Sequence, residues 1–225
     1  MILNKMKKII NVLAMLMTLS TPLYALSPLP DFPETSQQKT ILMLGDSLTQ
    51  GYGLPQEDGL VSQLQNWLNK NNSNIKLINA GVSGDTTAGG LSRIEWSLSP
   101  DITGVVVSLG GNDLLRGIDP ENTKENLEKI SKIIKERNLD LVIIGLEAPL
   151  NYGEEYKKVF DSIYPDLAKK YEAYYIKNLF TPLLEVTNFN NIPMQYMQSD
   201  GVHPNKEGVS LIVNFIAPTI KSLGK

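Results

Sequence analysis

The feature that most constrains this chain is an alternation of short apolar runs with longer segments of helical periodicity. Short runs rich in Ile, Leu and Val are typical of strands that are buried on both faces of a sheet. These runs lie at residues 41–45, 75–79, 105–109 and 141–146, with a weaker fifth at 174–176. Apolar residues at helical spacing lie between them, as in residues 61–68 and 127–134. The alternation predicts an α/β fold in which a parallel sheet is covered by helices on both faces.

The first 25 residues have the order of charge, apolar run and small residues that is typical of a secretory signal peptide. Three lysines precede a mostly apolar run over residues 9–19, which is shorter than the roughly 20 apolar residues that a spanning helix needs. We therefore expect residues 1–25 to be removed after Ala25 and the protein to be periplasmic or secreted. Because Leu23 stands where a small residue is preferred, a retained membrane anchor is the alternative.

Composition limits the partners that the chain can have. It contains no cysteine, which excludes disulfides and a lipid-modified cysteine. The formal net charge of −3 includes the basic leader, and no Lys/Arg cluster follows it, so nucleic acid is not an expected partner. Residues 26–38 carry three prolines and predict a loose lead-in segment. Residues 39–225 fit one domain with a sizeable core, and we expect it to be a monomer.

Small and polar residues follow the first three predicted strands. In parallel sheets, ligands gather where the carboxyl ends of the strands meet, so these loops are where chemistry is expected. The three loops are residues 45–47 (GDS), 80–85 (AGVSGD) and 110–113 (GGND).

The chain contains a single histidine, His203, three residues after Asp200. That separation lets the carboxylate accept from one ring nitrogen while the other faces a nucleophile, which fixes the imidazole tautomer and raises its basicity. Pro204 suits the first turn of a last helix that runs through Val209, Ile212, Val213 and Ile216, which would place both side chains on the preceding loop. A histidine that merely caps the start of that helix would have the same sequence pattern.

Ser47 directly follows the first predicted strand, and Gly45 before it permits a tight turn. The serine hydroxyl is therefore expected at the sheet edge, although a serine here also suits a helix cap. Position 49 is Thr, so this is not a Gly-x-Ser-x-Gly elbow. Acyl transfer also needs donors for an oxyanion, and Gly84 and Asn112 offer a backbone N–H and a side-chain amide. Each of these two residues would fit an ordinary turn equally well.

Four blocks in this order resemble the SGNH (GDSL) hydrolase family. The blocks are residues 45–48 (GDSL), 80–86 (AGVSGDT), 110–113 (GGND) and 200–204 (DGVHP). The resemblance covers essentially the whole chain after the leader. It implies a flavodoxin-like three-layer α/β/α sandwich with a central parallel five-stranded sheet, and a mechanism that uses no metal and no cofactor. Residues 110–117, 148–153 and 163–168 further resemble the family's branch of periplasmic bacterial thioesterases, lysophospholipases and arylesterases.

The resemblance also implies a role for each block. Ser47 would attack the acyl carbonyl, His203 would take the serine proton and return it to the leaving group, and Asp200 would orient His203. The oxyanion would be held by the backbone N–H groups of Ser47 and Gly84 and by the Asn112 amide. Asp46 and Asp113 are expected to accept hydrogen bonds that organise their loops.

The resemblance to this branch further implies that the loop after the fourth predicted strand borders the acyl pocket, with Gly153 allowing it to move. Its candidate substrate-binding residues are Pro149, Leu150, Asn151 and Tyr152. Apolar residues within 186–197 are a second candidate lining. The branch commonly has an arginine shortly before this proline, where the chain has Glu147 and Ala148, so its substrate preference is open.

The expected substrate is a small-molecule acyl ester, thioester or lysophospholipid, with peripheral contact with envelope lipids. A carbohydrate O-acetyl esterase of the same family is the main alternative. A metal-dependent phosphoesterase could use the aspartates at the strand ends, but their spacing matches no metal motif. A non-catalytic flavodoxin-like module could cradle a phosphate at residues 45–53, but that loop lacks both Gly-Lys-Ser/Thr and Gly-x-Gly-x-x-Gly.

Overall fold

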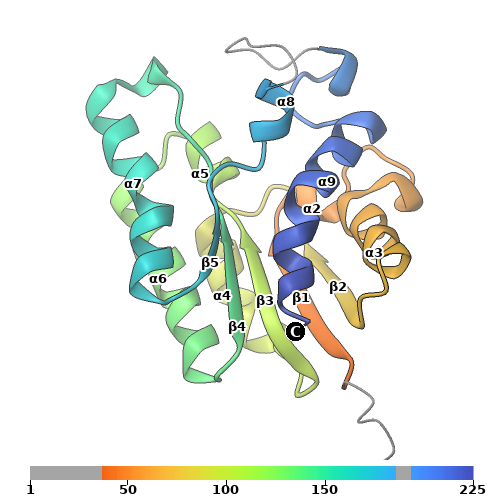
Figure 1. Cartoon of the computed structure of the whole chain (residues 1–225). Helices are drawn as coiled ribbons and strands as arrows, with labels where there is room; N and C mark the ends of the chain where they lie inside the picture. Colours follow the sequence, from red (N-terminus) through yellow and green to blue (C-terminus); the bar gives the residue numbers. More distant parts are fainter. Residues whose placement is uncertain (1–36, 186–193, 225) are drawn as a thin grey trace, which may run out of the picture. The chain divides into compact units, whose positions relative to one another are not determined.

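A single parallel sheet of five strands, in the order β2-β1-β3-β4-β5, organises the chain (Figure 1). A computed structural model describes residues 37–185 and 194–224. The strands are β1 (Lys39–Gly45), β2 (Ile75–Gly81), β3 (Ile102–Ser108), β4 (Asp140–Ile144) and β5 (Tyr174–Ile176). All five predicted strands are confirmed, with ends that differ from the predicted ones by up to three residues. The predicted signal peptide and most of the predicted lead-in segment lie outside the described residues.

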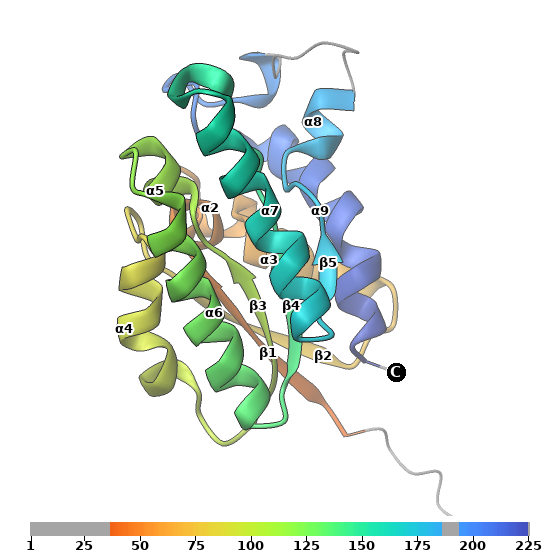
Figure 2. The same cartoon turned by 90° about the vertical axis from the view of Figure 1, so that its left-hand side faces the viewer.

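Helices cover both faces of the sheet, and this confirms the predicted three-layer α/β/α architecture. The helices are α2 (Ser47–Gln50), α3 (Leu60–Lys70), α4 (Thr87–Ser97), α5 (Gly111–Leu115), α6 (Pro120–Glu136), α7 (Glu154–Lys170), α8 (Thr181–Glu185) and α9 (Lys206–Ser222). Short 3-10 turns lie at Gln56–Asp58, Leu150–Tyr152 and Met194–Tyr196. Helices α4, α6 and α7 lie in front of the sheet in Figure 2, and α3 and α9 lie behind it.

The core is divided by the sheet into two clusters, because successive side chains of a strand point to opposite faces. In β1, Ile41 and Met43 pack against α3, α8 and α9, whereas Leu42 and Leu44 pack against α4, α6 and α7. All four side chains are buried. A strand in the middle layer therefore needs apolar side chains on both of its faces. The continuous apolar run at residues 41–44 is the sequence signal that predicted β1.

The register brings the carboxyl ends of three strands level. Gly45 pairs with Gly81 on one side and with Ser108 on the other. The loops that follow β1, β2 and β3 therefore leave the sheet at the same edge, as predicted from their sequences.

The start of the last helix differs from the prediction. Helix α9 begins at Lys206, and its N-cap is Asn205, whose side chain accepts from Gly208 N at 3.0 Å. Pro204 lies before the cap rather than in the first turn and forms an isolated bridge with Met197. The Asn205 side-chain oxygen accepts from an N–H group in the first turn that has no partner within the helix. The helix therefore begins directly after Asn205.

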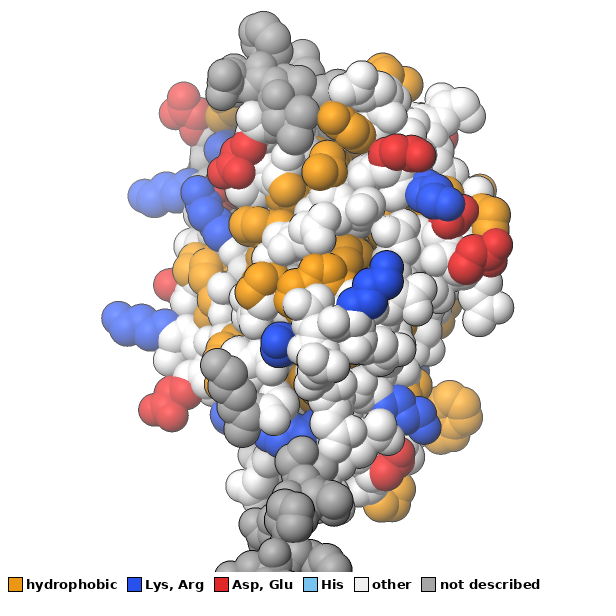
Figure 3. Space-filling view, turned by 45° about the vertical axis from the view of Figure 1, so that its right-hand side comes forward, with side chains coloured by type: hydrophobic (Ala, Val, Ile, Leu, Met, Phe, Trp, Pro, Cys, Tyr) orange, Lys and Arg blue, Asp and Glu red, His pale blue; other side chains and the backbone are white. Residues whose placement is uncertain are grey.

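The outer surface of α3 and α9 is partly apolar. Figure 3 shows hydrophobic side chains across the middle of this face, with most of the acidic side chains towards its margins. Within the described part of the chain, no helix combines the length and the hydropathy that crossing a membrane would require.

Candidate active site

Ser47 is the first residue of α2, immediately beyond the end of β1. The cap of this helix is Asp46, whose carboxylate accepts from Leu48 N at 3.1 Å, so the alternative that Ser47 is the cap is wrong. The loop-organising role that was predicted for Asp46 is confirmed by the same bond. Because Ser47 is not used as a cap, its hydroxyl is available for another partner.

Gly45 is needed for a different reason from the predicted one. Its backbone is not in the positive-φ region, so the turn itself does not require a glycine. A Cβ at this position would lie 2.0 Å from the Thr49 hydroxyl oxygen and 3.0 Å from the carbonyl oxygen of Ser108. The glycine therefore allows α2 to pack closely against the ends of β1 and β3.

The three residues of the predicted triad meet. His203 Nε2 lies 2.8 Å from Ser47 Oγ, and His203 Nδ1 lies 2.7 Å from Asp200 Oδ2. The other carboxylate oxygen, Oδ1, accepts from the backbone N–H groups of Val202 and His203 at 2.9 and 3.0 Å. The sequence could predict that Asp200 and His203 are neighbours. Only the fold brings His203 to Ser47, which lies 156 positions earlier in the chain.

The pKa values of the two aspartates that line the site, Asp200 and Asp46, are shifted in opposite directions because their surroundings differ. Hydrogen bonds from the His203 backbone N–H, the His203 ring and the Val202 N–H lower the pKa of Asp200 to about 2. Burial instead raises the pKa of Asp46 to about 6, although the Leu48 N–H partly offsets this effect. Asp200 therefore stays ionised at any pH at which the imidazole works as a base.

Tyr52 contacts the imidazole and was not predicted as a site residue. The centroids of its ring and the His203 ring are 4.8 Å apart, with the planes tilted by 39°. Tyr52 follows α2 closely in the chain, but nothing in its sequence position indicates that a loop 150 residues later would bring a histidine against it.

The predicted oxyanion donors lie on the loops after β2 and β3. Gly84 has a φ of +79°, a conformation that favours glycine, and its carbonyl accepts from Arg116 Nη2 at 2.8 Å. Asn112 lies in the first turn of α5, next to the buried Asp113. The Asp113 carboxylate accepts from the N–H and the hydroxyl of Thr87 at 2.8 and 2.5 Å, which confirms its predicted role as a loop acceptor.

One cavity of about 680 Å³ joins these groups. Ser47, Gly84, Asn112, Asp200 and His203 all line it. The rest of its lining is largely apolar and includes Leu48, Tyr52, Leu114, Leu115, Leu146, Phe180, Leu184 and Val202, with Asp46, Ser83, Glu147 and Asn178 as polar members. Most of these apolar residues were not predicted, because they come from loops and short helices without a periodic pattern.

The four candidate substrate-binding residues do not line this cavity. They form the turn Leu150–Tyr152 and the residue before it, and the Tyr152 hydroxyl lies 3.5 Å from the carbonyl oxygen of Leu115, which is itself in the cavity wall. Tyr152 thus contacts a residue of the wall, and the contact of Pro149, Leu150, Asn151 and Tyr152 with a substrate stays a prediction. Most of the second candidate lining, residues 186–193, lies outside the described residues.

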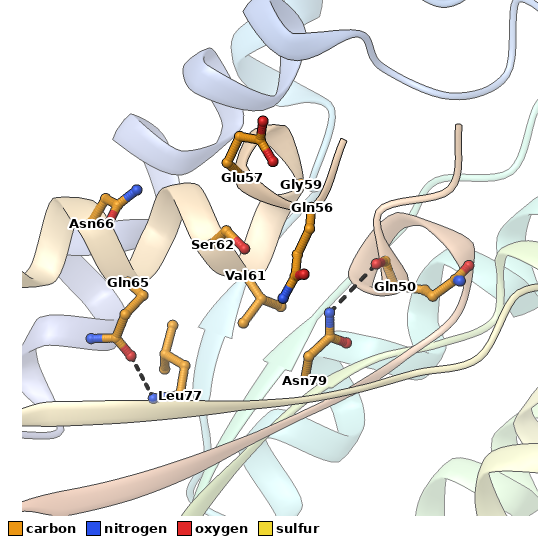
Figure 4. A pocket seen from close by; sticks show the side chains of 10 residues that line it. All are labelled: Gln50, Gln56, Glu57, Gly59, Val61, Ser62, Gln65, Asn66, Leu77 and Asn79. Atoms are coloured by element: carbon orange, nitrogen blue, oxygen red, sulfur yellow. Dashed lines mark hydrogen bonds between the residues drawn. The ribbon is translucent and has the colours of Figure 1, made fainter. Parts of the chain in front are cut away.

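A second cavity of about 580 Å³ is polar and contains none of the triad residues. It lies between α3, the end of α2 and the edge strand β2 (Figure 4). Gln65 is tied to this edge, because its side-chain oxygen accepts from Leu77 N at 2.7 Å. No nucleophile with a neighbouring base lines this cavity, so we assign the chemistry to the first cavity. The described residues include no group of three or more His, Asp or Glu side chains that could hold a metal ion.

Comparison with known proteins gives consistent results. The model of the GDSL-like Lipase/Acylhydrolase family matches residues 43–211. Thioesterase 1/protease 1/lysophospholipase L1 of Escherichia coli K12 is 32% identical over 189 residues, which cover 82% of this chain and 84% of that protein. An arylesterase of Vibrio mimicus is 34% identical over 184 residues, with 79% and 86% covered. The crystal structure of the psychrotrophic esterase EstA from Pseudoalteromonas sp., inhibited by monoethylphosphonate, has a TM-score of 0.74 at 33% identity and covers 82% and 98%.

Proposed function

The chain belongs to the GDSL-like lipase/acylhydrolase family and is an ester and thioester hydrolase, and we propose that Ser47, His203 and Asp200 are its catalytic triad. The observation that carries this proposal is the continuous hydrogen-bonded row from Ser47 Oγ through both ring nitrogens of His203 to Asp200 Oδ2. Such a row is what a serine needs in order to be activated at neutral pH.

In the proposed mechanism, Ser47 Oγ attacks the acyl carbonyl while its proton moves to His203 Nε2. The ionised Asp200 stabilises the resulting imidazolium and keeps Nδ1 protonated. The C–O or C–S bond of the substrate then breaks, and His203 returns the proton to the leaving group. A water molecule, activated by the same imidazole, hydrolyses the acyl-serine ester and restores the free enzyme.

The negative charge on the tetrahedral intermediate requires donors beside Ser47. We assign this role to the backbone N–H groups of Ser47 and Gly84 and to the Asn112 side-chain amide. The N–H of Ser47 belongs to the first turn of α2 and has no partner within the helix. A donor of this kind typically contributes about 3 kcal/mol to lowering the barrier.

The apolar wall of the cavity supports an acyl chain as the bound group. Each methylene that such a chain buries contributes about 0.8 kcal/mol. Three of the wall residues, Tyr52, Leu115 and Val202, are also large exposed apolar side chains, so an apolar surface extends from the cavity to the solvent. This arrangement suits small-molecule acyl esters, thioesters and lysophospholipids, and peripheral contact with envelope lipids is part of the proposal.

We also propose the oligomeric state and the location of the enzyme. All the groups assigned to the site come from one chain, so a monomer suffices for activity. The leader pattern in residues 1–25 supports export to the periplasm or the medium.

The test is the rate of hydrolysis of 4-nitrophenyl esters from acetate to palmitate by the purified protein without its leader. We expect kcat/KM to rise with acyl length until the cavity is filled, and Ser47→Ala to lower kcat by at least about 10³-fold. Ser92→Ala removes an exposed hydroxyl outside the cavity and serves as the matched control. Equal rates for wild type and Ser47→Ala would disprove the catalytic assignment, and a sharp preference for acetate would indicate an O-acetyl esterase.

A further inference from the structure

The nucleophile and the base belong to segments that are far apart in the chain. Ser47 begins α2 after the first strand, whereas His203 lies on the loop before the last helix. The distance between the two reacting atoms must be kept within a fraction of an ångström, because a displacement of about 1 Å can cost about 10²-fold in rate. A single hydrogen bond between two side chains does not hold two loops to that tolerance.

A second connection runs parallel to the Ser47–His203 bond and consists of backbone groups bridged by one side chain. Tyr52 N donates to the carbonyl oxygen of Ser47 at 3.0 Å. Gln198 Nε2 donates to the carbonyl oxygen of Tyr52 at 2.8 Å, and Gln198 N donates to the carbonyl oxygen of His203 at 2.7 Å. Together with the bond between the two catalytic side chains, these contacts close a ring that contains both reacting residues.

The Gln198 amide also donates to the carbonyl oxygen of Pro204 at 3.0 Å, so its NH₂ group serves both loops at once. Two donors on one planar group are needed for this, and among uncharged side chains only those of Asn and Gln have them.

The local backbone is shaped to admit this side chain. Gly53 has a φ of +74°, and a Cβ at that position would lie 2.1 Å from Gln198 Oε1. The side chain of Gln198 therefore occupies the space that any other residue at position 53 would fill. Next to it, the Tyr52 ring lies against the imidazole, so a movement of the Tyr52 backbone would also move a wall of the His203 site.

We infer that Gln198 is a positioning residue that holds the segment from Ser47 to Tyr52 and the loop from Asp200 to Pro204 at the separation at which the serine and the imidazole react. This inference rests on the proposed function, because the ring of hydrogen bonds positions a reaction only if Ser47 and His203 are catalytic. Gln198 itself touches neither reacting side chain and contributes through backbone carbonyls alone.

The experiment replaces Gln198 by Met, which keeps the length of the side chain and removes both donors. We expect Gln198→Met to lower kcat for 4-nitrophenyl butyrate by about 10- to 100-fold, with KM within about threefold of wild type because the apolar wall is unchanged. The midpoint of the acidic limb of the pH–rate profile should not move, since Gln198 does not contact the ring. Thermal melts give the folded fraction, so kcat is expressed per folded molecule.

Gln63→Met is the matched control. Gln63 Nε2 also donates to two carbonyls, those of Asp58 at 2.8 Å and Lys206 at 3.1 Å, and so ties the turn before α3 to the start of α9, without touching the Tyr52 or His203 segments. We expect Gln63→Met to lower Tm about as much as Gln198→Met does and to leave kcat within about twofold of wild type. If Gln198→Met keeps the wild-type kcat, or if both variants lose the same kcat, the inference is wrong. Ser47→Ala separates this outcome from a failure of the proposed function, which would leave the wild type itself without serine-dependent activity.

Discussion

At the scale of single residues, the site shows how the surroundings shift the pKa of one residue type in opposite directions. Asp200 is exposed and forms three hydrogen bonds, with the backbone N–H groups of Val202 and His203 and with the His203 ring, which favours its carboxylate form. Asp46 is 5% exposed, and burial penalises its charge more than the Leu48 N–H can offset. Asp200, which is proposed to orient the base, and Asp46, which caps α2, are thus distinguished by solvation, although both are aspartates.

The raised pKa of Asp46 predicts a pH-dependent stability. Its pKa is about 6 in the folded state and ordinarily 3.8, so the folded protein binds this proton more tightly than the unfolded chain does. The resulting stabilisation is fully present below about pH 3.8 and is lost as the pH rises through about 6. Each pKa unit corresponds to about 1.4 kcal/mol, so the free energy of unfolding should fall by up to about 3 kcal/mol over this range.

Asp46→Asn removes the charge and keeps an oxygen that can accept from Leu48 N. We expect the difference in unfolding free energy between Asp46→Asn and wild type to grow by about 2–3 kcal/mol from pH 4 to pH 7, in favour of the variant. Urea unfolding at several pH values measures it. Asp166→Asn, at an exposed acid on α7, controls for the general effect of removing a carboxylate. Parallel pH dependences of Asp46→Asn and wild type would contradict the prediction.

At the scale of elements, the junction of β1 and α2 decides where Ser47, the proposed nucleophile, lies. The strand ends level with its neighbours, and the helix packs directly onto that end because Gly45 has no side chain. The next glycine on that edge, Gly81, has the same function, since a Cβ there would lie 2.2 Å from Gln50 N. Close packing of α2 on two strand ends is therefore what fixes Ser47 at the sheet edge.

Gly45→Ala tests this packing. The added Cβ would meet Thr49 and the carbonyl oxygen of Ser108, and we expect a loss of about 3 kcal/mol in the free energy of unfolding. Gly201→Ala is the comparison, because that residue has a φ of +66° and open space around it, so only backbone strain of about 1 kcal/mol is added. Urea unfolding gives both values. A larger loss for Gly201→Ala would show that space at Gly45 is not limiting.

At the scale of the whole molecule, the two core clusters and all five strands lie within one compact unit, Ser36–Lys225. The cavity draws on loops from both halves of this unit, from Asp46 to His203. The fold must therefore be nearly complete before the groups that line the cavity can meet.

The proposed signal peptide leads to a prediction at this scale. We expect the exported protein to begin at Leu26, because cleavage is predicted after Ala25, and N-terminal sequencing of the secreted form measures this. A chain that begins at Ser36 should have the same free energy of unfolding as that form within about 0.5 kcal/mol, since residues 26–38 are predicted to be a loose lead-in segment and changes outside the core usually have effects of this size. A full-length protein that retains residues 1–25 in the membrane fraction would instead support the anchor.

The sequence by itself determined the architecture and the family. Apolar runs and helical spacing are local patterns, so they fixed the five strands, and the four blocks indicated Ser47, Gly84, Asn112, Asp200 and His203. Only the tertiary structure decided what surrounds these groups. The apolar wall, the contact of Tyr52 with His203, the bridge made by Gln198 and the raised pKa of Asp46 depend on residues far apart in the chain. Burial and close approach are properties of the packed chain, and no local pattern encodes them.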